Sequence, residues 1–381
     1  MNIRLKMRII EFMRFAADEN NTKITGRTIY RDGVRYLGYT GSSVSFRFKG
    51  KTAKVELVSD ASTHEKRDYA WVAVFVKEEK DNEISYGAAA DEEPYKRFCL
   101  DKDEAEYVLY ESDEEKTVTV TLIKYSEAEY AACGIKWIET DSEEILTPPA
   151  AKKLKIEMVG DSITCGYGNE GGVEETQHDT SKENPMGAYS LLTATHLDAD
   201  VNVVAWNGKG VITAYIGEDA PKVKDADWLV PMLYEYTDAG CERDYLHTPE
   251  DKWEKWDNSN FIPDIITVYL GTNDASYTDN DAARNEEFVN GYTKFLGTIR
   301  SKNPEIPILC MLGTMDKRLC GSVERAVELF NSKNNTDNVY YLELPFQDEA
   351  DGLSINWHPT VKTHRKTAEI VEKKIIEILK K

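Results

Sequence analysis

The chain has 381 residues, which is more than one hydrophobic core usually spans, so we expect two domains. Hydrophobic residues make up 41% of the sequence and aromatic residues 10%, which is enough for packed cores and excludes a disordered chain. The formal net charge of −21 argues against nucleic acid or an anionic membrane as a partner, because both bind cationic surfaces.

The cysteines and the N-terminal stretch bear on the cellular compartment. The six cysteines are scattered without a CxxC pair, which favours buried free thiols over a disulfide framework or a zinc site. The basic N-terminal stretch is interrupted by Arg and Glu, so it lacks the apolar core of a signal peptide. No apolar run approaches the roughly 20 residues of a membrane span. We therefore expect a cytoplasmic protein that does not enter a membrane.

The first part of the chain, residues 1–146, is predicted to form a β domain. Five segments alternate apolar with polar residues and are separated by turn-forming residues: SSVSFRFKG, TAKVELVSD, YAWVAVFVKEE, AEYVLYES and KTVTVTLIKY. Short strands without a helix between them are typical of a β-sandwich or jelly roll. Residues 1–18 are expected to form a helical extension that packs on this domain or at the interface of a homo-oligomer.

The prolines of LTPPAAKK, Pro148 and Pro149, mark the domain boundary, because proline disrupts both helix interiors and central strands. In residues 150–381, strand-like runs alternate with helix-like segments, which predicts an α/β domain with a mainly parallel sheet. The strand-like runs are KIEMVG, ADVNVVAW, DIITVYLG, IPILCML and VYYLELP, and the helix-like segments include GAYSLLTATHL, EEFVNGYTKFLGTIRSK, VERAVELFNSK and an amphipathic C-terminal stretch. Loops that follow such strands are expected to carry the chemistry.

The segment KIEMVGDSITCGYGNE, residues 155–170, begins like two different kinds of site. Together with Gly171, its glycines Gly166 and Gly168 match G-x-G-x-x-G, the fingerprint of dinucleotide binding. That fingerprint requires the first glycine to close the strand and the third to open a helix. Here the strand ends at Gly160, and a polar, proline-terminated stretch follows the third glycine. We therefore exclude a dinucleotide cradle.

Ser162, which follows the strand directly, is instead a candidate nucleophile. A nucleophilic serine needs a base that takes its proton and donors that hold the oxyanion. His358, in INWHPT, is the candidate base, because it precedes the terminal helix and the pKa of histidine lies near working pH. Gly208 in NGKG and Asn273 in GTND lie at strand ends, where a backbone N–H and a side-chain amide can face the site.

These blocks carry a resemblance to a known family. GDSIT, the Gly of NGKG, GTND and WHP resemble, in this order, the four blocks of the SGNH (GDSL-like) hydrolases. GDSITCGYG, VAWNGKGV, MLYEYT and WDNSNFIPDIITVYLGTND resemble the acetyl esterases of carbohydrate esterase family 2, and ITGRTIYRDGVRYLGYTGSSVSFRFKG is similar to the start of their jelly-roll domain. The resemblance covers roughly residues 22–380. It implies a three-layer α/β/α hydrolase domain that removes acetyl groups from xylan or small acetylated sugars without a metal or cofactor.

Residue by residue, the resemblance implies a Ser–His acyl-enzyme mechanism. Ser162 would be the nucleophile and His358 the general base. The backbone N–H groups of Ser162 and Gly208 and the side-chain amide of Asn273 would form the oxyanion hole.

The resemblance leaves the third member of a catalytic triad unassigned. Many SGNH enzymes have Asp three residues before the histidine, where this chain has Ile355, and some family 2 members carry it two residues before, where Asn356 stands. We expect a dyad in which a neutral acceptor, Asn356 or a backbone carbonyl, orients His358. Asp348 and Asp351 remain alternatives.

Three further residues are candidates for contact with the substrate, and two other functions remain open. Trp357 and Trp206 could offer an indole face to a pyranose ring, and Lys209 could bind sugar hydroxyls. The alternatives are an SGNH lipase or thioesterase and a non-catalytic glycan-binding protein. The polar loops at 169–186 and 237–260 argue against a lipase, and the joint presence of Ser162, Asn273 and His358 argues against a pure binder.

Overall fold

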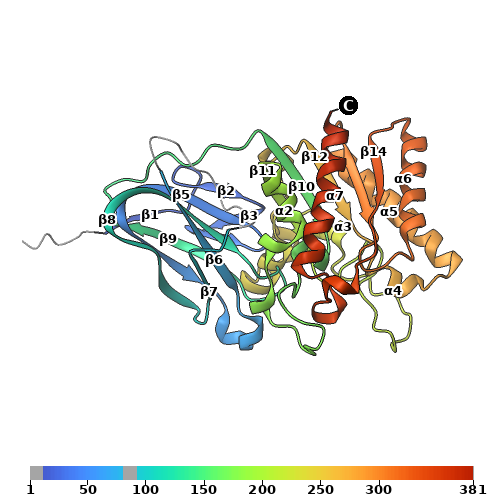
Figure 1. The fold of residues 1–381 in the computed structure, drawn as a ribbon, viewed down its shortest axis with the longest axis horizontal. Helices are drawn as coiled ribbons and strands as arrows, with labels where there is room; N and C mark the ends of the chain where they lie inside the picture. The colour runs from blue at the N-terminus through green and yellow to red at the C-terminus, as the bar shows by residue number, and fades with distance from the viewer. Residues whose placement is uncertain (1–11, 80–91, 381) are drawn as a thin grey trace, which may run out of the picture.

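The computed structural model describes residues 12–79 and 92–380. Two domains lie side by side along the long axis of the molecule, a β domain at the left of Figure 1 and an α/β domain at the right. The chain leaves the first domain after strand β9 and enters the second at strand β10, so the prolines of residues 148–149 lie in the connection.

The strands of the first domain form one antiparallel sheet of nine strands within the described residues, in the order β3-β4-β9-β5-β8-β6-β7, with β1 added to β9 and β2 to β5. The strands are β1 (Met13–Phe15), β2 (Lys23–Thr25), β3 (Thr28–Arg31), β4 (Val34–Leu37), β5 (Ser43–Val58), β6 (Trp71–Glu78), β7 (Lys96–Cys99), β8 (Glu104–Lys124) and β9 (Gly134–Thr140). The expected jelly-roll-like antiparallel domain is confirmed.

Two details of this domain differ from the sequence-based expectation. SSVSFRFKG and TAKVELVSD are one strand, β5, and AEYVLYES and KTVTVTLIKY are one strand, β8. The two long strands pair along their whole length, and shifts of register between Gly50 and Lys54 absorb the turn-like residues as bulges. The helical extension is wrong where it can be tested, because Met13–Phe15 pairs with β9 as a strand, while residues 1–11 lie outside the described part.

The second domain is built on a parallel sheet in the order β11-β10-β12-β13-β14. Its strands are β10 (Leu154–Gly160), β11 (Ala199–Ala205), β12 (Ile265–Tyr269), β13 (Ile308–Leu312) and β14 (Val339–Glu343). Each of the five runs predicted from the sequence is therefore a strand. The runs are apolar and not alternating because both faces of such a sheet are covered.

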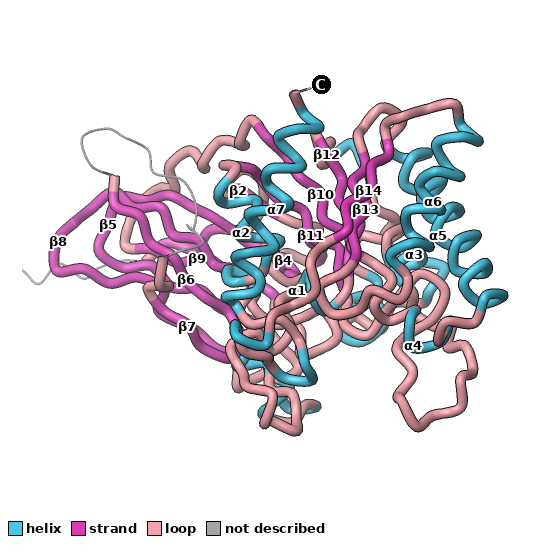
Figure 2. The backbone as a smooth tube through the Cα atoms, turned by 45° about the vertical axis from the view of Figure 1, so that its right-hand side comes forward, coloured by secondary structure: helices cyan, strands magenta, loops and turns pink. Residues whose placement is uncertain are grey.

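Helices cover both faces of the parallel sheet, as the expected three-layer arrangement requires. They are α1 (Ser162–Cys165), α2 (Tyr189–His196), α3 (Val230–Leu233), α4 (Ala275–Thr278), α5 (Ala282–Lys302), α6 (Cys320–Asn334) and α7 (Val361–Leu379). Helix α2 packs against α7 on one side, and α5 packs against α6 on the other, with the strands between the two pairs in Figure 2. None of the described helices is long and apolar enough to span a membrane.

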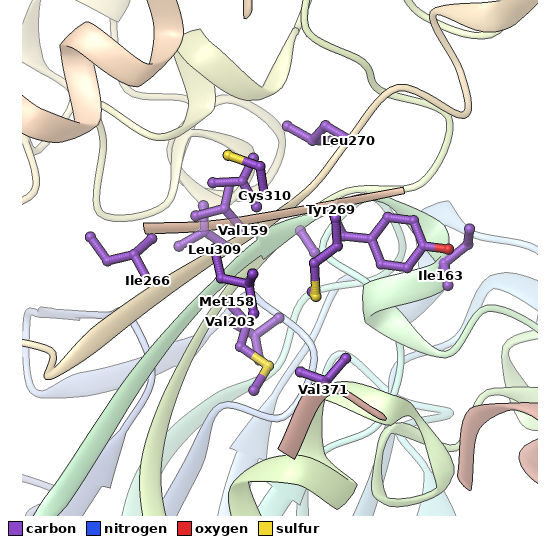
Figure 3. Close-up of a cluster of buried hydrophobic side chains, with 14 of the residues drawn as sticks. Met158, Val159, Ile163, Val203, Ile266, Tyr269, Leu270, Leu309, Cys310 and Val371 are labelled. Atoms are coloured by element: carbon purple, nitrogen blue, oxygen red, sulfur yellow. The ribbon is translucent and has the colours of Figure 1, made fainter. Parts of the chain in front are cut away.

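The main hydrophobic core fills the spaces between this sheet and its helices. Figure 3 shows how side chains from neighbouring strands meet there, with Val371 of α7 on one side of the sheet. Met158 and Val159 are both fully buried although they point to opposite faces of β10, which confirms that β10 is covered on both sides. The six cysteines are free thiols, and all except the half-buried Cys99 are buried.

A buried ion pair joins the two domains. Arg27, between β2 and β3, contacts Glu157 of β10 at 3.1 Å, and both side chains are almost fully enclosed. The guanidinium of Arg27 also donates to the carbonyl oxygens of Tyr234 and Tyr236 at 2.8 and 2.9 Å. Removing one member would leave a buried charge without its partner, which would destabilise the contact between the domains.

Candidate active site

The candidate site lies at one edge of the parallel sheet, where three neighbouring strands end. Gly160 at the end of β10 is in register with Ala205 of β11 and Tyr269 of β12. The residues that follow these strands therefore leave the sheet at the same level. This is the edge at which ligands bind in open α/β sheets.

Ser162 is held at the start of a short helix directly after β10. Asp161 caps this helix, because its carboxylate accepts a hydrogen bond from the N–H of Ile163 at 3.1 Å. Gly160 is required because a Cβ there would lie 1.9 Å from Oγ1 of Thr164 in the same helix. Ser162 itself is only 5% exposed, so its hydroxyl is presented from a rigid, nearly closed position.

The hydroxyl of Ser162 meets His358, as expected. Nε2 of His358 lies 2.8 Å from Oγ of Ser162, although the residues are 196 positions apart in the chain. Burial lowers the pKa of His358 to about 4, so its imidazole is neutral near pH 7 and can accept the serine proton.

A backbone carbonyl orients the imidazole. Nδ1 of His358 lies 3.0 Å from the carbonyl oxygen of Ile355. Because a carbonyl can only accept, Nδ1 must carry the proton, and the lone pair of Nε2 is left facing Ser162. Ile355 stands where many SGNH enzymes have Asp, and its backbone, not its side chain, supplies the acceptor.

Asn356, the side chain proposed to orient His358, points elsewhere. Its amide donates to the hydroxyl of Tyr167 at 3.1 Å, so the prediction of Asn356 as the orienting acceptor is wrong. Asn356 and Trp357 both have positive φ, 51° and 60°, which is a strained conformation for residues other than glycine. This left-handed turn lies between the carbonyl of Ile355 and the imidazole that it contacts.

The aspartates that were kept as alternatives do not contact His358. Asp351 forms ion pairs with Lys362, at 2.8 Å, and with Lys366, both on helix α7. These two lysines hold the pKa of its carboxyl below the usual range. Asp348 caps a short turn by accepting from the N–H of Ala350 at 2.9 Å.

The glycines that mimic a dinucleotide fingerprint serve the histidine loop instead. A Cβ on Gly168 would lie 3.0 Å from Cβ of Ile355, and a Cβ on Gly171 would lie 2.5 Å from its Cγ1. Ser354 adds a hydrogen bond from its hydroxyl to the carbonyl oxygen of Gly168. Gly166 ends helix α1 with a φ of 84°. The two glycines at 168 and 171 therefore make room for Ile355, whose carbonyl orients His358.

Gly208, the residue predicted to be an oxyanion donor, has a backbone conformation that favours glycine. A Cβ at this position would meet no atom within 4 Å, so close approach within the protein does not require glycine. Its φ of 68° does. Within the described residues the backbone N–H groups of Ser162 and Gly208 have no protein acceptor, which leaves both free to bind an oxyanion.

The amide of Asn273 links the three loops. Its Nδ2 lies 3.2 Å from Oδ2 of Asp161 and 3.1 Å from the carbonyl oxygen of Lys209. To bind an oxyanion as well, Asn273 must share one of these two hydrogens. Burial, together with the neighbouring carboxylate of Asp274, raises the pKa of Asp161 to about 7.

Asp274 holds the turn that follows Gly208. Its carboxylate accepts from the N–H groups of Val211, Ile212 and Thr213 at 2.7 to 3.2 Å. Asp161 and Asp274 thus both hold loop backbone in place.

The two tryptophans predicted to contact the substrate, Trp357 and Trp206, differ in their exposure to solvent. Trp357 beside His358 is 64% exposed, so its indole face is available to a ligand. Trp206 is 2% exposed and its ring packs against Trp228, with centroids 5.7 Å apart. A buried ring cannot serve as a platform for a sugar, so the structure does not support that role for Trp206. Lys209 is half-buried, and its carbonyl, not its ammonium group, has the contact described above.

Comparison with known protein families shows the family to which the chain belongs. The GDSL-like lipase/acylhydrolase family matches residues 158–366, more than half of the chain, and the carbohydrate esterase 2 N-terminal family matches residues 24–149. The chain therefore belongs to the GDSL-like lipase/acylhydrolase family and, within it, to carbohydrate esterase family 2.

Named relatives of this family 2 member include an esterase and a deacetylase. Cellulase/esterase CelE of Acetivibrio thermocellus is 28% identical over 92% of this chain. The match covers only 39% of that protein, so this chain spans less than half of its length. An acetylxylan esterase / glucomannan deacetylase of Cellvibrio japonicus is 26% identical over 96% of this chain and 90% of its own length.

Solved structures of family 2 esterases have the same two-domain fold. A family two carbohydrate esterase from Clostridium thermocellum, in complex with cellohexaose, has a TM-score of 0.77 at 27% identity and covers 94% of this chain and 99% of its own. An acetyl xylan esterase from the rumen bacterium Butyrivibrio proteoclasticus has a TM-score of 0.81 at 20% identity, over 97% of this chain and 99% of its own. The second likeness bears on the fold alone.

In this family 2 chain, the N-terminal domain contributes to the site in a way that the sequence did not indicate. Glu127 and Glu129, in the loop after β8, bind the backbone and side chains of Trp206 and Asn207 next to Gly208. The stretch YSEAEY reads as an ordinary polar loop, and no local pattern reveals a partner that is 78 residues away. The described residues hold no group of three or more His, Cys, Asp or Glu side chains arranged for a metal ion.

Proposed function

We propose that this protein is an acetyl esterase that removes O-acetyl groups from xylan, xylo-oligosaccharides or other acetylated sugars by a Ser–His acyl-enzyme mechanism. The observation that carries the proposal is the 2.8 Å contact between Oγ of Ser162 and Nε2 of His358. We assign the oxyanion hole to the backbone N–H groups of Ser162 and Gly208, which donate to no backbone carbonyl in the described part of the chain. A nucleophile, a neutral base and preorganised donors are the parts that acyl transfer needs.

In the first half of the reaction, Oγ of Ser162 attacks the acetyl carbonyl carbon while Nε2 of His358 takes the hydroxyl proton. The carbonyl oxygen becomes an oxyanion, which the N–H groups of Ser162 and Gly208 bind, with a shared hydrogen from Asn273. When the carbon–oxygen bond to the sugar breaks, His358 gives its proton to the departing sugar oxygen. An acetyl-serine and a free sugar hydroxyl result.

In the second half, a water molecule attacks the acetyl group of the acyl-enzyme. His358 accepts a proton from this water and returns it to Oγ of Ser162 as the bond to the acetyl carbon breaks. Acetate leaves and the free enzyme is restored. The Nδ1–H bond to the carbonyl of Ile355 keeps Nε2 directed at the reacting atoms in both halves.

The carbohydrate part of the proposal is supported by the family and by the surroundings of His358. One relative described above is named an acetylxylan esterase / glucomannan deacetylase, and a solved family two carbohydrate esterase holds cellohexaose. The exposed indole of Trp357 adjoins the base and offers an apolar face of the kind that packs on pyranose rings. A charged, polar surface suits such a substrate better than a lipid.

Acetate release from acetylated xylan and from acetylated xylo-oligosaccharides, measured beside hydrolysis of nitrophenyl acetate, butyrate and octanoate, tests the proposal. We expect release from the acetylated sugars and a preference for the acetyl ester. A preference for long acyl chains would favour a lipase or thioesterase. Xylan binding without hydrolysis of any ester would favour a glycan-binding protein, and either result would overturn the proposal.

A further inference from the structure

Two glutamates of the N-terminal domain hold the residues that lead into Gly208. Oε1 of Glu129 accepts from Nδ2 of Asn207, and Oε2 of Glu129 accepts from the indole Nε1 of Trp206, each at 3.0 Å. Oε2 of Glu127 accepts from the backbone N–H of Asn207 at 2.9 Å. Asn207 is therefore fixed through both its main chain and its side chain by residues outside the catalytic domain.

The loop that carries these glutamates is itself firmly held. Lys124, a fully buried residue at the end of β8, donates to the carbonyl oxygens of Ser126 and Glu127 at 2.8 and 2.7 Å. The backbone N–H of Glu127 donates to the carboxylate of Glu183, from the catalytic domain, at 2.8 Å. The loop is thus held in place at the interface between the domains, so its glutamates can restrain the turn at Gly208.

The direction of the N–H of Gly208 depends on the position of Asn207, because the peptide bond between them is planar. The N–H of Gly208 lies in one plane with the carbonyl of Asn207, so the backbone of Asn207 decides where the N–H points. Behind the turn, the carbonyl of Gly208 accepts from the N–H of Tyr215 at 2.7 Å. The turn is also closed by the N–H of Lys209, which donates to the carbonyl oxygen of Trp206 at 3.4 Å. The bonds from the two glutamates to Asn207 add to these restraints on the peptide.

Of the two glutamates, Glu129 offers the clearer role. Glu127 is fully buried beside Glu183, and its removal would disturb the packing of the interface as well as the turn. Glu129 is half-buried, and the two oxygens of its carboxylate accept hydrogen bonds from the side chains of Trp206 and Asn207. A carboxylate that accepts from two donors on consecutive residues restrains both of them at once.

We propose that Glu129 is a positioning residue of the oxyanion hole, and that the N-terminal domain is therefore a working part of the active centre. Glu129 does not touch the substrate. It acts through Asn207 on the N–H of Gly208, where negative charge develops during attack by Ser162. The inference rests on the proposed acyl-transfer function, because only that chemistry gives the N–H of Gly208 its task.

The test uses the full chain and the variants Glu129→Ala, Glu129→Gln, Asn207→Ala and the double variant Glu129→Ala/Asn207→Ala. Glu144→Ala, which removes an exposed carboxylate in the connection between β9 and β10, is the matched control. For each protein, kcat and KM are measured with 4-nitrophenyl acetate. The rate at which diethyl 4-nitrophenyl phosphate labels Ser162 is measured too, because its phosphoryl oxygen occupies the same hole. Melting temperatures report whether each variant is folded.

We expect Glu129→Ala to lower kcat roughly 10- to 100-fold, less than the roughly 10²- to 10³-fold loss that follows removal of an oxyanion donor itself. Labelling should slow in parallel, while KM and the melting temperature stay close to those of the wild type. Glu129→Gln keeps one good acceptor and should lose less. Because Glu129 acts through Asn207, the double variant should lose no more than the more damaged single variant.

The outcomes separate this inference from the proposed function. A wild-type protein that neither hydrolyses nitrophenyl acetate nor reacts with the phosphate ester would overturn the proposed function. An active wild type whose Glu129→Ala variant keeps its kcat would overturn the positioning role. So would losses that add in the double variant, or a loss of kcat that is matched by an equal loss in Glu144→Ala.

Discussion

The carbonyl oxygen of Ile355 lies 3.0 Å from Nδ1 of His358, in the place where a catalytic triad has a carboxylate. A carbonyl fixes the tautomer and the direction of the imidazole as a carboxylate does. It carries no full charge, so it stabilises the imidazolium less. In the proposed mechanism, Ser162 and His358 therefore form a dyad with a neutral acceptor behind the histidine.

The dyad predicts which substitutions abolish activity. Ser162→Ala and His358→Ala should each reduce kcat for nitrophenyl acetate by roughly 10³-fold or more. Asp351→Ala should change kcat less than about threefold, because Asp351 binds lysines of α7 and not His358. Steady-state kinetics of the three variants check this. If Asp351→Ala were as damaging as Ser162→Ala, the base would have an acidic partner and the dyad would be wrong.

The contact between Gly171 and Ile355 predicts a packing effect on catalysis. In Gly171→Ala the new methyl group would lie 2.5 Å from Cγ1 of Ile355, so the histidine loop must shift. Overpacking of this kind costs about 1–3 kcal/mol of stability, and the displaced carbonyl should lower kcat as well. Thermal unfolding and kinetics with nitrophenyl acetate measure both effects.

Gly297→Ala is the matched control for that substitution. Gly297 lies inside helix α5, where an added Cβ would meet no atom within 4 Å. Alanine is the better helix former by about 1 kcal/mol, so this variant should melt slightly higher with unchanged kcat. Equal behaviour of the two variants would show that the crowding of Ile355 has no influence on the site.

The low pKa of His358 predicts a broad acid range. The imidazole must be neutral to accept the serine proton, so kcat/KM falls as the pH drops through the pKa of His358 in the free enzyme. Burial places that pKa at about 4 in place of 6.5, so kcat/KM at pH 5.5 should stay close to its value at pH 7. A pH–rate profile with nitrophenyl acetate, with tryptophan fluorescence to verify folding, provides the measurement. An acid limb centred at 6.5 would show that the imidazole is solvated.

The exposed ring of Trp357 predicts that its removal changes KM for acetylated sugars but not for a small aryl ester. Trp357→Ala should raise KM for acetylated xylo-oligosaccharides several-fold, because a pyranose loses its packing surface, and change KM for nitrophenyl acetate little. Its positive φ already strains a tryptophan, so Trp357→Gly, which also relieves that strain, is the companion variant. A comparable rise of KM for both substrates would assign Trp357 to the shape of the loop and not to sugar binding.

Much of the fold follows from the sequence because its patterns are local. Each apolar run from KIEMVG to VYYLELP is a strand, since a parallel sheet that is covered on both faces needs continuous apolar segments. The error in the first domain has the same origin. Bulges in β5 and β8 contain turn-forming residues, and only the pairing of the two strands shows that the chain continues through them.

The candidate site was predictable where its residues belong to short motifs, and not where it depends on distant contacts. The pairing of Ser162 with His358 follows from blocks that recur in one order. The acceptor behind His358 is a main-chain carbonyl, which no residue type can reveal. The burial of Trp206 and its bond to Glu129 depend on the packing of two domains, so a tryptophan beside a catalytic turn looked like a sugar platform.

The separation of 196 residues between Ser162 and His358 also determines the order in which the two residues are synthesised. Ser162 follows the first strand of the parallel sheet, whereas His358 comes just before α7, the last helix. A ribosome that makes the chain from its N-terminus finishes the nucleophile, the oxyanion donors and the whole β domain before it adds the base. A nascent chain that ends before His358 therefore lacks the base of the proposed mechanism and cannot hydrolyse an ester by it.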